Sequence, residues 1–287
     1  MDNPGLDRSA FDPGRRPALQ LRADCANCFG LCCVALPFAR SADFALTKAA
    51  GEPCVNLEDD FRCGIHAKLR ESGFKGCTVY DCFGAGQRVA QHTYGGVSWR
   101  DEPQSAGEMY AVFAVVRQLN EILWYLGEGL GRPEASLVHA SLASEFDRIE
   151  AITLAEPAVL LALDVQAERS AVAPLLAEVS EVVRREARVG AAPLPRRALP
   201  DADLLGADFA GSDLRGANLR GAYLIAANLA GADLRGADVL GADLRDAGLS
   251  GANLSSALFL TQFQVNAARG DARTVLPGGL ERPEHWG

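Results

Sequence analysis

The sequence has 287 residues, and its 28 Lys and Arg against 37 Asp and Glu give a formal net charge of -9. That length favours two domains over one large core. The negative charge argues against a dedicated nucleic-acid binder, which must neutralise phosphates, and no apolar run is long enough to span a bilayer. We therefore expect a soluble, cytoplasmic protein that binds neither membranes nor nucleic acid directly.

The chain begins with a polar stretch, residues 1–20, that contains three prolines and lacks the apolar core of a signal peptide. We predict a flexible arm there. The predicted domains that follow are a cysteine-rich metal-binding module (21–100), a helical region (101–189), a linker (190–200) and a repeat domain with its C-terminal cap (201–287).

All eight cysteines lie between Cys25 and Cys82. In a reducing compartment, thiols crowded in this way are more often metal ligands or reactive groups than disulfides. The predicted metal ligands are Cys25, Cys28, Cys32, Cys33, Cys54, Cys63, Cys77, Cys82 and His66. The adjacent Cys32 and Cys33 cannot easily aim both sulfurs at one tetrahedral ion, which favours two neighbouring sites or a shared bridging sulfur. If there are two ions, one of them draws partly on Cys54, Cys63, Cys77 and Cys82.

The cysteine spacing resembles that of a known family. Cys-x2-Cys-x3-Cys-Cys from Cys25 to Cys33 is followed by Pro-Cys54 and by Cys63-Gly-Ile-His66, as in the zinc- or iron-chelating CxxCxxxCC family. The resemblance covers residues 25–82, with Cys77 as the late cysteine, and implies metal binding without a settled activity. Thiolates suit zinc, iron, an iron–sulfur cluster or copper, and closed thiolate sites are usually structural zinc. His66 fits a ligand and an outer partner of a sulfur equally well.

Apolar residues at helical spacing predict several helices between about 104 and 188. Ser105-Ala-Gly-Glu108 has the form of a capping box for the first, and Pro133 suits the first turn of the second. The residues expected on the buried side of the second helix are Leu137, Val138, Leu142, Phe146 and Ile149. Gly84-Ala-Gly86 lacks the preceding strand that a nucleotide-binding loop requires.

From Ala202 to Thr261 a five-residue phrase of the form Ala-Asp-Leu-x-Gly occurs twelve times. Five is the period of neither a helix nor a strand, but it fits a chain that turns a corner every five residues. One large apolar residue and one small residue then point inward on each side of a square coil, while Asp, Asn, Arg and Gly lie outside. The tract resembles the pentapeptide-repeat family, which implies a right-handed quadrilateral β-helix, here of three coils.

Solenoids need covered ends. We expect the helices to cover the first coil of the repeat. The residues expected to cover the last coil are Phe263, Val265, Leu276 and Trp286.

The predicted fold class is multidomain α+β, with a loop-rich cysteine module, a helical centre and a C-terminal solenoid. The favoured function is metal binding, with the solenoid as a scaffold for a protein partner or a homodimer. One alternative is a redox enzyme that uses iron, an iron–sulfur cluster or copper on a peptide or small molecule, with no catalytic residue assigned. Resemblance to pentapeptide-repeat DNA mimics adds a modulator of DNA gyrase, although four arginines offset the aspartates of this short tract.

Overall fold

The computed structural model describes residues 21–287, and the predicted arm at 1–20 lies outside the described residues. Internal contacts divide the chain into two units. The solenoid unit contains Gly127–Leu142 and Pro174–Gly287, and the cysteine unit contains residues 21–126 and Ala143–Ala173. This division does not test the predicted domain boundaries, which stay a prediction.

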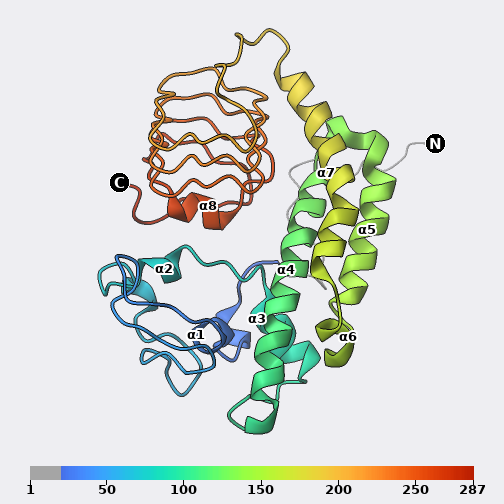
Figure 1. Cartoon of the computed structure of the whole chain (residues 1–287), viewed down its shortest axis with the longest axis vertical. Coiled ribbons are helices and arrows are strands. Elements are labelled where there is room, and N and C mark those ends of the chain that lie inside the picture. Colours follow the sequence, from blue (N-terminus) through green and yellow to red (C-terminus); the bar gives the residue numbers. More distant parts are fainter. Residues whose placement is uncertain (1–20) are drawn as a thin grey trace, which may run out of the picture. The chain divides into compact units, whose positions relative to one another are not determined.

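Helices are short in the cysteine region and long in the centre of the chain, as Figure 1 shows. In chain order they are η2 (Cys25–Asn27), α1 (Leu31–Ala35), η3 (His66–Lys68), α2 (Lys75–Thr78), α3 (Ala85–Gln87), the π-helix η4 (Arg88–Thr93), η5 (Pro103–Ser105), α4 (Ala106–Leu130), η6 (Pro133–Val138), α5 (His139–Ile152), α6 (Pro157–Leu161), α7 (Val165–Ala187) and α8 (Gln262–Ala267). Strand pairing among the described residues consists of isolated bridges. Within residues 21–287, the helices fall short of the length and apolarity needed to cross a membrane.

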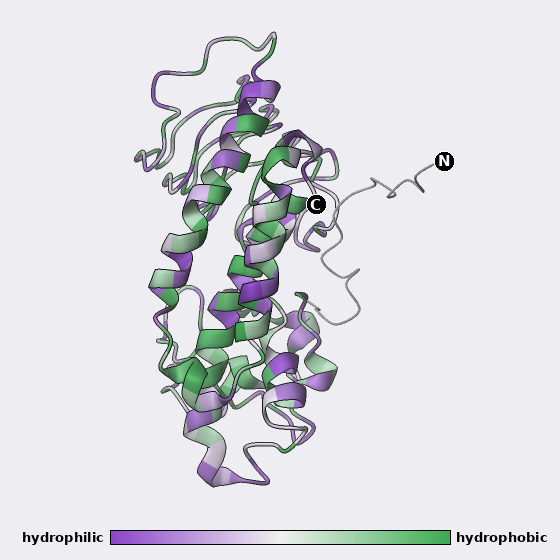
Figure 2. Cartoon of the chain, turned by 90° about the vertical axis from the view of Figure 1, so that its right-hand side faces the viewer, coloured by the Kyte–Doolittle hydropathy of each residue, from purple (hydrophilic) through white to green (hydrophobic). Residues whose placement is uncertain are grey.

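The central helices confirm the predicted helical region and most of its apolar pattern. On α4 the predicted apolar side is buried throughout, and Figure 2 shows hydrophobic and hydrophilic residues sharing each long helix. The predicted capping box is wrong: Ser105 Oγ donates to the Glu102 carbonyl, and Glu108 accepts a hydrogen bond from the Tyr94 hydroxyl. Ser105 belongs to the short 3-10 helix η5, and its hydroxyl is hydrogen-bonded within that helix, so it does not cap α4.

The second predicted helix starts later than expected. Residues Pro133–Val138 form the 3-10 helix η6, and the α-helix α5 begins only at His139. Because a 3-10 helix has three residues per turn, Leu137 does not share a side with Leu142. Leu137 is 97% exposed, so its predicted place in the core is wrong, whereas Leu142, Phe146 and Ile149 are buried.

The repeat tract forms the coil that its period predicts. Parallel bridges join residues twenty apart, as in Asp203 with Tyr223 and Tyr223 with Asp243, so four phrases complete one turn. Figure 1 shows the resulting stack of four-sided coils in orange and red. The large apolar residues and most alanines of the phrases are buried and form one continuous core.

The repeated aspartates mainly stabilise turns. Asp203 Oδ1 accepts a hydrogen bond from the Leu205 amide, and equivalent bonds recur from Asp208 to Asp243. Asp238 is the exception to the predicted outward position, because it is fully buried and pairs with Arg220. Arg220 also donates to the Leu176 carbonyl of α7, which encloses this pair within the solenoid unit.

The ends of the solenoid are covered partly as predicted. Val265 and Trp286 are buried against the last coil and Leu276 packs on them, but Phe263 is 42% exposed. Phe263 lies on the outer side of α8, whose inner side presents Gln264 to the carbonyls of Val239 and Ala242.

The first coil is covered by the linker rather than by the helices. Leu194 and Ala198 of the linker pack against the solenoid core. The helical parts of this unit lie along one side of the coils, where Arg184 of α7 donates to the Gly216 carbonyl and Arg132 donates to the Ser256 carbonyl. The expected helical cap is therefore wrong, because arginine side chains tie the helices to carbonyls at the coil corners.

Candidate metal centre

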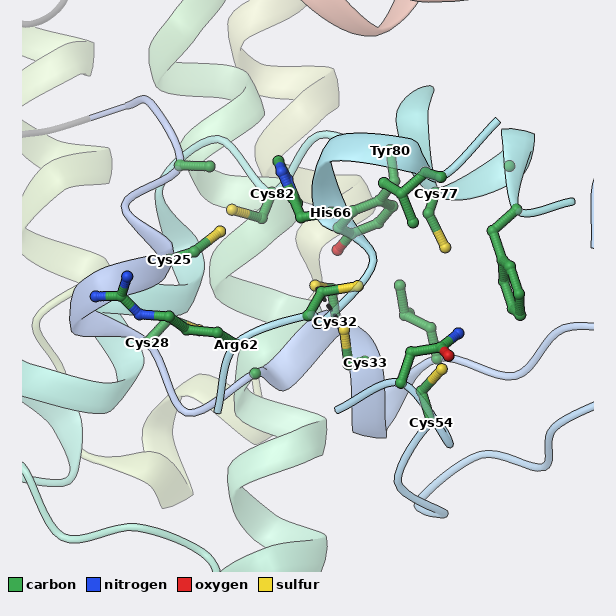
Figure 3. A pocket seen from close by; sticks show the side chains of 18 of the residues that line it. Cys25, Cys28, Cys32, Cys33, Cys54, Arg62, His66, Cys77, Tyr80 and Cys82 are labelled. Carbon is green, nitrogen blue, oxygen red and sulfur yellow. Dashed lines mark hydrogen bonds between the residues drawn. The ribbon is translucent and has the colours of Figure 1, made fainter. Parts of the chain in front are cut away.

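All eight predicted cysteines and His66 line one pocket of the cysteine unit, with a volume of about 700 Å³. The cysteines are free thiols that come from segments up to 57 residues apart in the chain. Aromatic and aliphatic side chains form most of the remaining wall, among them Leu36, Phe38, Phe44, Leu69, Phe74 and Tyr80. Figure 3 shows Cys32 and Cys33 between Cys25 and Cys82 on one side and Cys54 and Cys77 on the other.

The first four cysteines are positioned by two short helical turns. Asp24 caps η2, where its carboxylate accepts a hydrogen bond from the Ala26 amide. Gly30 adopts a φ of 66°, a left-handed conformation that glycine adopts readily, and it begins α1. Leu31 and Val34 bury one side of α1, which leaves the adjacent Cys32 and Cys33 at the pocket.

The last cysteine, Cys82, is held by α4. Cys82 lies between two residues whose carbonyls accept hydrogen bonds from this helix: Arg117 donates to Asp81, and Asn120 donates to Phe83. Asn120 is fully buried. The helix therefore supplies a fixed wall for one side of the pocket.

Three of the sulfurs accept hydrogen bonds from backbone amides. Cys28 accepts from Leu31 and Gly30, Cys63 accepts from Ile65, and Cys82 accepts from Gly86 and Gly84. Hydrogen bonds of this kind favour the charged form of the acceptor, here the thiolate. The glycines that the sequence excluded from a nucleotide loop thus have a different role at the Cys82 sulfur.

Burial works in the opposite direction. It raises the pKa of Cys28 to about 11 and that of Cys77 to about 12, and it also raises the pKa values of Cys25, Cys63 and Cys82. The adjacent pair behaves differently: a hydrogen bond between Cys32 and Cys33, with the sulfurs 4.0 Å apart, raises the pKa of Cys32 and lowers that of Cys33. Most of these thiols therefore need a bound cation to lose their protons at neutral pH.

The thiols line the wall of the pocket without converging on one point. Among residues 21–287, no three His, Cys, Asp or Glu side chains lie close enough together to hold a metal ion. The donor set nevertheless suits a soft cation, because thiolates are the ligands that zinc, iron and copper(I) prefer. The backbone amide donors to Cys28, Cys63 and Cys82 support the same chemistry.

Sequence reasoning missed Lys48, which is only 5% exposed. Its ammonium donates to the carbonyls of Val34, Ala49 and Glu52 at 2.7–3.0 Å. Among the described residues no carboxylate forms an ion pair with it. Burial lowers the pKa of Lys48, and the nearby Cys54 and Cys33 thiolates would raise it. The signal in the sequence was a single lysine within the otherwise uncharged stretch 44–51.

Tyr80 and His66 also line the pocket, Tyr80 with a buried hydroxyl and His66 with an exposed ring. Tyr80 has a buried hydroxyl without a hydrogen-bond partner, and burial raises its pKa well above the usual range. His66 lines the pocket and is exposed, and its two predicted roles stay predictions. Two other histidines lie away from the pocket: His92 is exposed and His139 hydrogen-bonds the Arg132 carbonyl.

Comparison with known proteins identifies the class of this chain. A family model described as pentapeptide repeats matches residues 202–239 and 222–259, on the coils described above. The chain is thus a pentapeptide repeat protein. It belongs to the same family as the uncharacterized protein YybG of Bacillus subtilis (strain 168), to which it is 56% identical over 266 residues, covering 93% of this chain and 95% of that protein.

Two solved structures share the repeat. Rfr23 of the cyanobacterium Cyanothece 51142 is 27% identical over 27% of this chain, with a TM-score of 0.14. A pentapeptide repeat protein of the Arabidopsis thaliana thylakoid lumen is 31% identical over 34% of this chain, with a TM-score of 0.17. The chain spans 63% and 66% of the lengths of these two proteins.

Proposed function

We propose that this protein binds a soft metal through the thiolates of its cysteine module and that its solenoid serves as an interaction scaffold. One observation supports metal binding above all: eight thiols, separated by up to 57 residues in the chain, line a single pocket. A reduced protein has little other reason to bring so many thiols together, since buried thiols pack no better than alanine or valine. The pocket belongs to a loop-rich region that a structural metal would stabilise.

Zinc fits this site best, because closed sites made of thiolates are usually structural zinc sites. Iron, an iron–sulfur cluster and copper(I) have the same preference for sulfur and are the other cofactors that we consider. The protein's own contribution is to hold the sulfurs on rigid turns, to donate amide hydrogen bonds to three of them and to exclude water with aromatic side chains.

Elemental analysis after anaerobic purification tests the proposal, with a thiol count and a visible spectrum on the same sample. One or two zinc ions per chain, with thiols protected from alkylation and no visible band, is the expected result. Iron or copper with charge-transfer bands would support metal binding and favour the redox alternative. Eight freely reactive thiols in a folded protein, with no metal taken up on reconstitution, would overturn it.

A metal-dependent redox enzyme is the second candidate, and the size of the pocket favours it. A volume of about 700 Å³ lies within the range of small-molecule sites and exceeds what metal ions need. The unpartnered hydroxyl of Tyr80 adds a polar group to a mostly apolar wall. If this candidate is correct, the metal-loaded protein should show a reversible change of its visible spectrum with a chemical reductant, and a spectroscopically silent protein would exclude it.

The scaffold role concerns the side of the coils that carries Leu205 and Tyr223. Both side chains are exposed, at 65% and 55%, and they lie on adjacent coils because Asp203 bridges Tyr223. A protein partner or a second copy of the chain would cover them. Light scattering of the purified protein tests the homodimer: a dimer that Tyr223→Ser converts to a monomer supports it, and a monomeric wild type at high concentration removes it.

A further inference from the structure

The division of the eight thiols between metal ions can be inferred from their neighbours, if the proposed metal binding is correct. Cys32 and Cys33 follow each other on α1, and their sulfurs are 4.0 Å apart. Their neighbours differ, although Cys33 also acts on Cys25. Cys28 and Cys82 are the other thiols that raise the pKa of Cys32, whereas Cys33 raises the pKa values of Cys63 and Cys77 and also that of Cys25. Backbone contacts therefore have to place Cys25.

The turn from Gly84 to Gly86 brings Cys28 and Cys82 together. A Cβ added to Gly86 would lie 2.6 Å from the Cys28 sulfur, so this sulfur rests directly on the glycine. The Gly86 amide donates to the Cys82 sulfur.

The segment with Cys25 is pinned to the same turn. Gln87 of α3, the residue after Gly86, donates to the Arg22 carbonyl and accepts from the Asp24 amide. Figure 3 shows the sulfurs of Cys25 and Cys82 pointing toward each other, and Cys25 is among the charges that act on Cys82. Cys25, Cys28 and Cys82 therefore share one side of the pocket with Cys32.

The main chain joins the other cysteines. The Cys54 amide donates to the Cys33 carbonyl at 3.0 Å. Leu57 then connects two of them, because its amide donates to the Cys54 carbonyl and it forms a bridge with Cys63. Cys77 is acted on by Cys33, Cys54 and Cys63, and its sulfur faces that of Cys54 in Figure 3.

Lys48 gives this second group a fixed positive charge. A buried ammonium is costly unless a negative charge compensates it, and carbonyl oxygens satisfy its hydrogen bonds without neutralising it. A centre of four thiolates around a divalent ion has a net charge of about -2. Lys48 Nζ donates to the Val34 carbonyl, next to Cys33, and to the Glu52 carbonyl, two residues before Cys54. An anionic centre at Cys33 and Cys54 would therefore supply the missing charge.

We propose that the eight thiols form two four-thiolate centres that meet at the Cys32–Cys33 peptide. Cys25, Cys28, Cys32 and Cys82 make the first centre. Cys33, Cys54, Cys63 and Cys77 make the second, with Lys48 as its counter-cation. Side-chain rotation within the pocket brings each set of sulfurs onto one ion, and the adjacent cysteines each serve a different ion.

Titration of the reduced, full-length protein with Co²⁺ tests the division, because cobalt bound to four thiolates has intense visible and near-ultraviolet bands. We expect two equivalents per chain in native mass spectrometry. The double variant Cys28→Ser with Cys82→Ser should keep one equivalent, and Cys54→Ser with Cys77→Ser should keep the other, each retaining a four-thiolate spectrum.

The outcomes separate this inference from the proposed function. If either double variant loses both equivalents while remaining folded by circular dichroism, or if the wild type takes up a single ion or one undivided cluster, the two centres are overturned and metal binding stands. If the wild type binds neither Co²⁺ nor Zn²⁺, the proposed function fails, and the inference fails with it.

A second experiment tests the counter-cation. Lys48→Met keeps the length of the side chain and removes its charge, and we expect cobalt affinity at the second centre to fall about tenfold or more. Cobalt at the first centre should bind as in the wild type, which also reports that the variant is folded. Lys68→Met, which removes an exposed lysine of η3, is the matched control. Equal weakening of both centres by Lys48→Met, or no weakening, would contradict the assignment.

Discussion

At the scale of the residue, each unit contains a charged side chain that is largely buried and held by hydrogen bonds. In the cysteine unit it is Lys48, whose ammonium meets three carbonyls. In the solenoid unit it is Glu128 of α4, which accepts hydrogen bonds from Arg132 and from the Phe259 amide. The Glu128 contact joins residues 131 apart in the chain, whereas the acceptors of Lys48 all lie within 14 residues of it.

Gly86→Ala should weaken the first metal centre selectively. The added methyl group would lie 2.6 Å from the Cys28 sulfur and would displace it. We expect a roughly 10- to 100-fold loss of cobalt affinity at the first centre and none at the second. The control is Gly107→Ala, where an added Cβ meets no atom within 4 Å. An unchanged titration would show that Cys28 is not a ligand in this position.

Glu128 should carry a measurable part of the stability of the solenoid unit. Glu128→Ala removes the acceptor of the Phe259 amide and the partner of Arg132, and we expect it to lower the free energy of unfolding by about 2 kcal/mol. Glu128→Gln keeps a carbonyl oxygen for these donors and should cost about 1 kcal/mol. Urea unfolding followed by circular dichroism measures both.

The same variants predict a pH dependence with a definite sign. Burial raises the pKa of Glu128 above its ordinary value, despite the nearby Arg132. Its contribution to stability is therefore complete below the unfolded pKa and is lost as the pH rises through the folded pKa. The stability advantage of the wild type over Glu128→Gln should shrink as the pH rises above the ordinary glutamate value of 4.5. An advantage that grows as the pH rises would contradict a raised pKa for Glu128.

At the scale of the element, the contact between α7 and the coils is tested by two glycines in the same conformation. Gly216 and Gly206 have φ values of 60° and 62°, so alanine is strained at both, by about 1 kcal/mol. Only at Gly216 would the new Cβ meet the Arg184 backbone oxygen, at 2.4 Å, whereas at Gly206 it meets nothing within 4 Å.

We expect Gly206→Ala to lower the free energy of unfolding by about 1 kcal/mol and Gly216→Ala by roughly 2–3 kcal/mol, because a backbone oxygen cannot rotate away. Equilibrium unfolding in urea gives both values. Equal effects would mean that α7 does not pack on this corner in solution.

The elements differ in how far the sequence determines them. The coils follow directly from the phrase, because every five residues repeat the same local requirement and four repeats return to the same side. Leu137 and Phe263 were misplaced because burial depends on where a short helix starts and which side it turns inward. Asp238 occupies the same position of the phrase as the outward aspartates, but it is buried because it pairs with Arg220, eighteen residues earlier. The phrase around Asp238 does not indicate this partner.

The pocket shows the same limit. Crowding and spacing of the cysteines indicated that the thiols gather, and all eight do line one pocket. The division that we propose around Cys32 and Cys33 rests on backbone turns such as Gly84–Gly86, and the position of Lys48 depends on three separate carbonyls. These features come from the tertiary structure and were not readable from spacing alone.

At the scale of the whole molecule, removal of metal should affect one unit and leave the other unchanged. The proposed ligands all lie in the cysteine unit, and the coils have a hydrophobic core of their own. After treatment with a chelator under reducing conditions, we expect backbone amides of residues 25–82 to exchange faster with deuterium. Amides of the middle coil, residues 222–241, should exchange as before, and an equal loss of protection in both regions would contradict the independence of the coils.

The arginine contacts along one side of the solenoid also limit how many coils it can contain. Arg188, just after α7, donates to the Arg215 carbonyl, and Arg132, just after α4, donates to the Ser256 carbonyl. These corner positions are two coils apart, a rise of about 10 Å at the spacing of paired strands. Inserting twenty residues would add one complete coil and move one of the two carbonyls out of reach of its arginine. Inserting five residues would move that carbonyl to the next side of the coil. A repeat that could grow by simple duplication is thereby held to a fixed number of turns by the helices beside it.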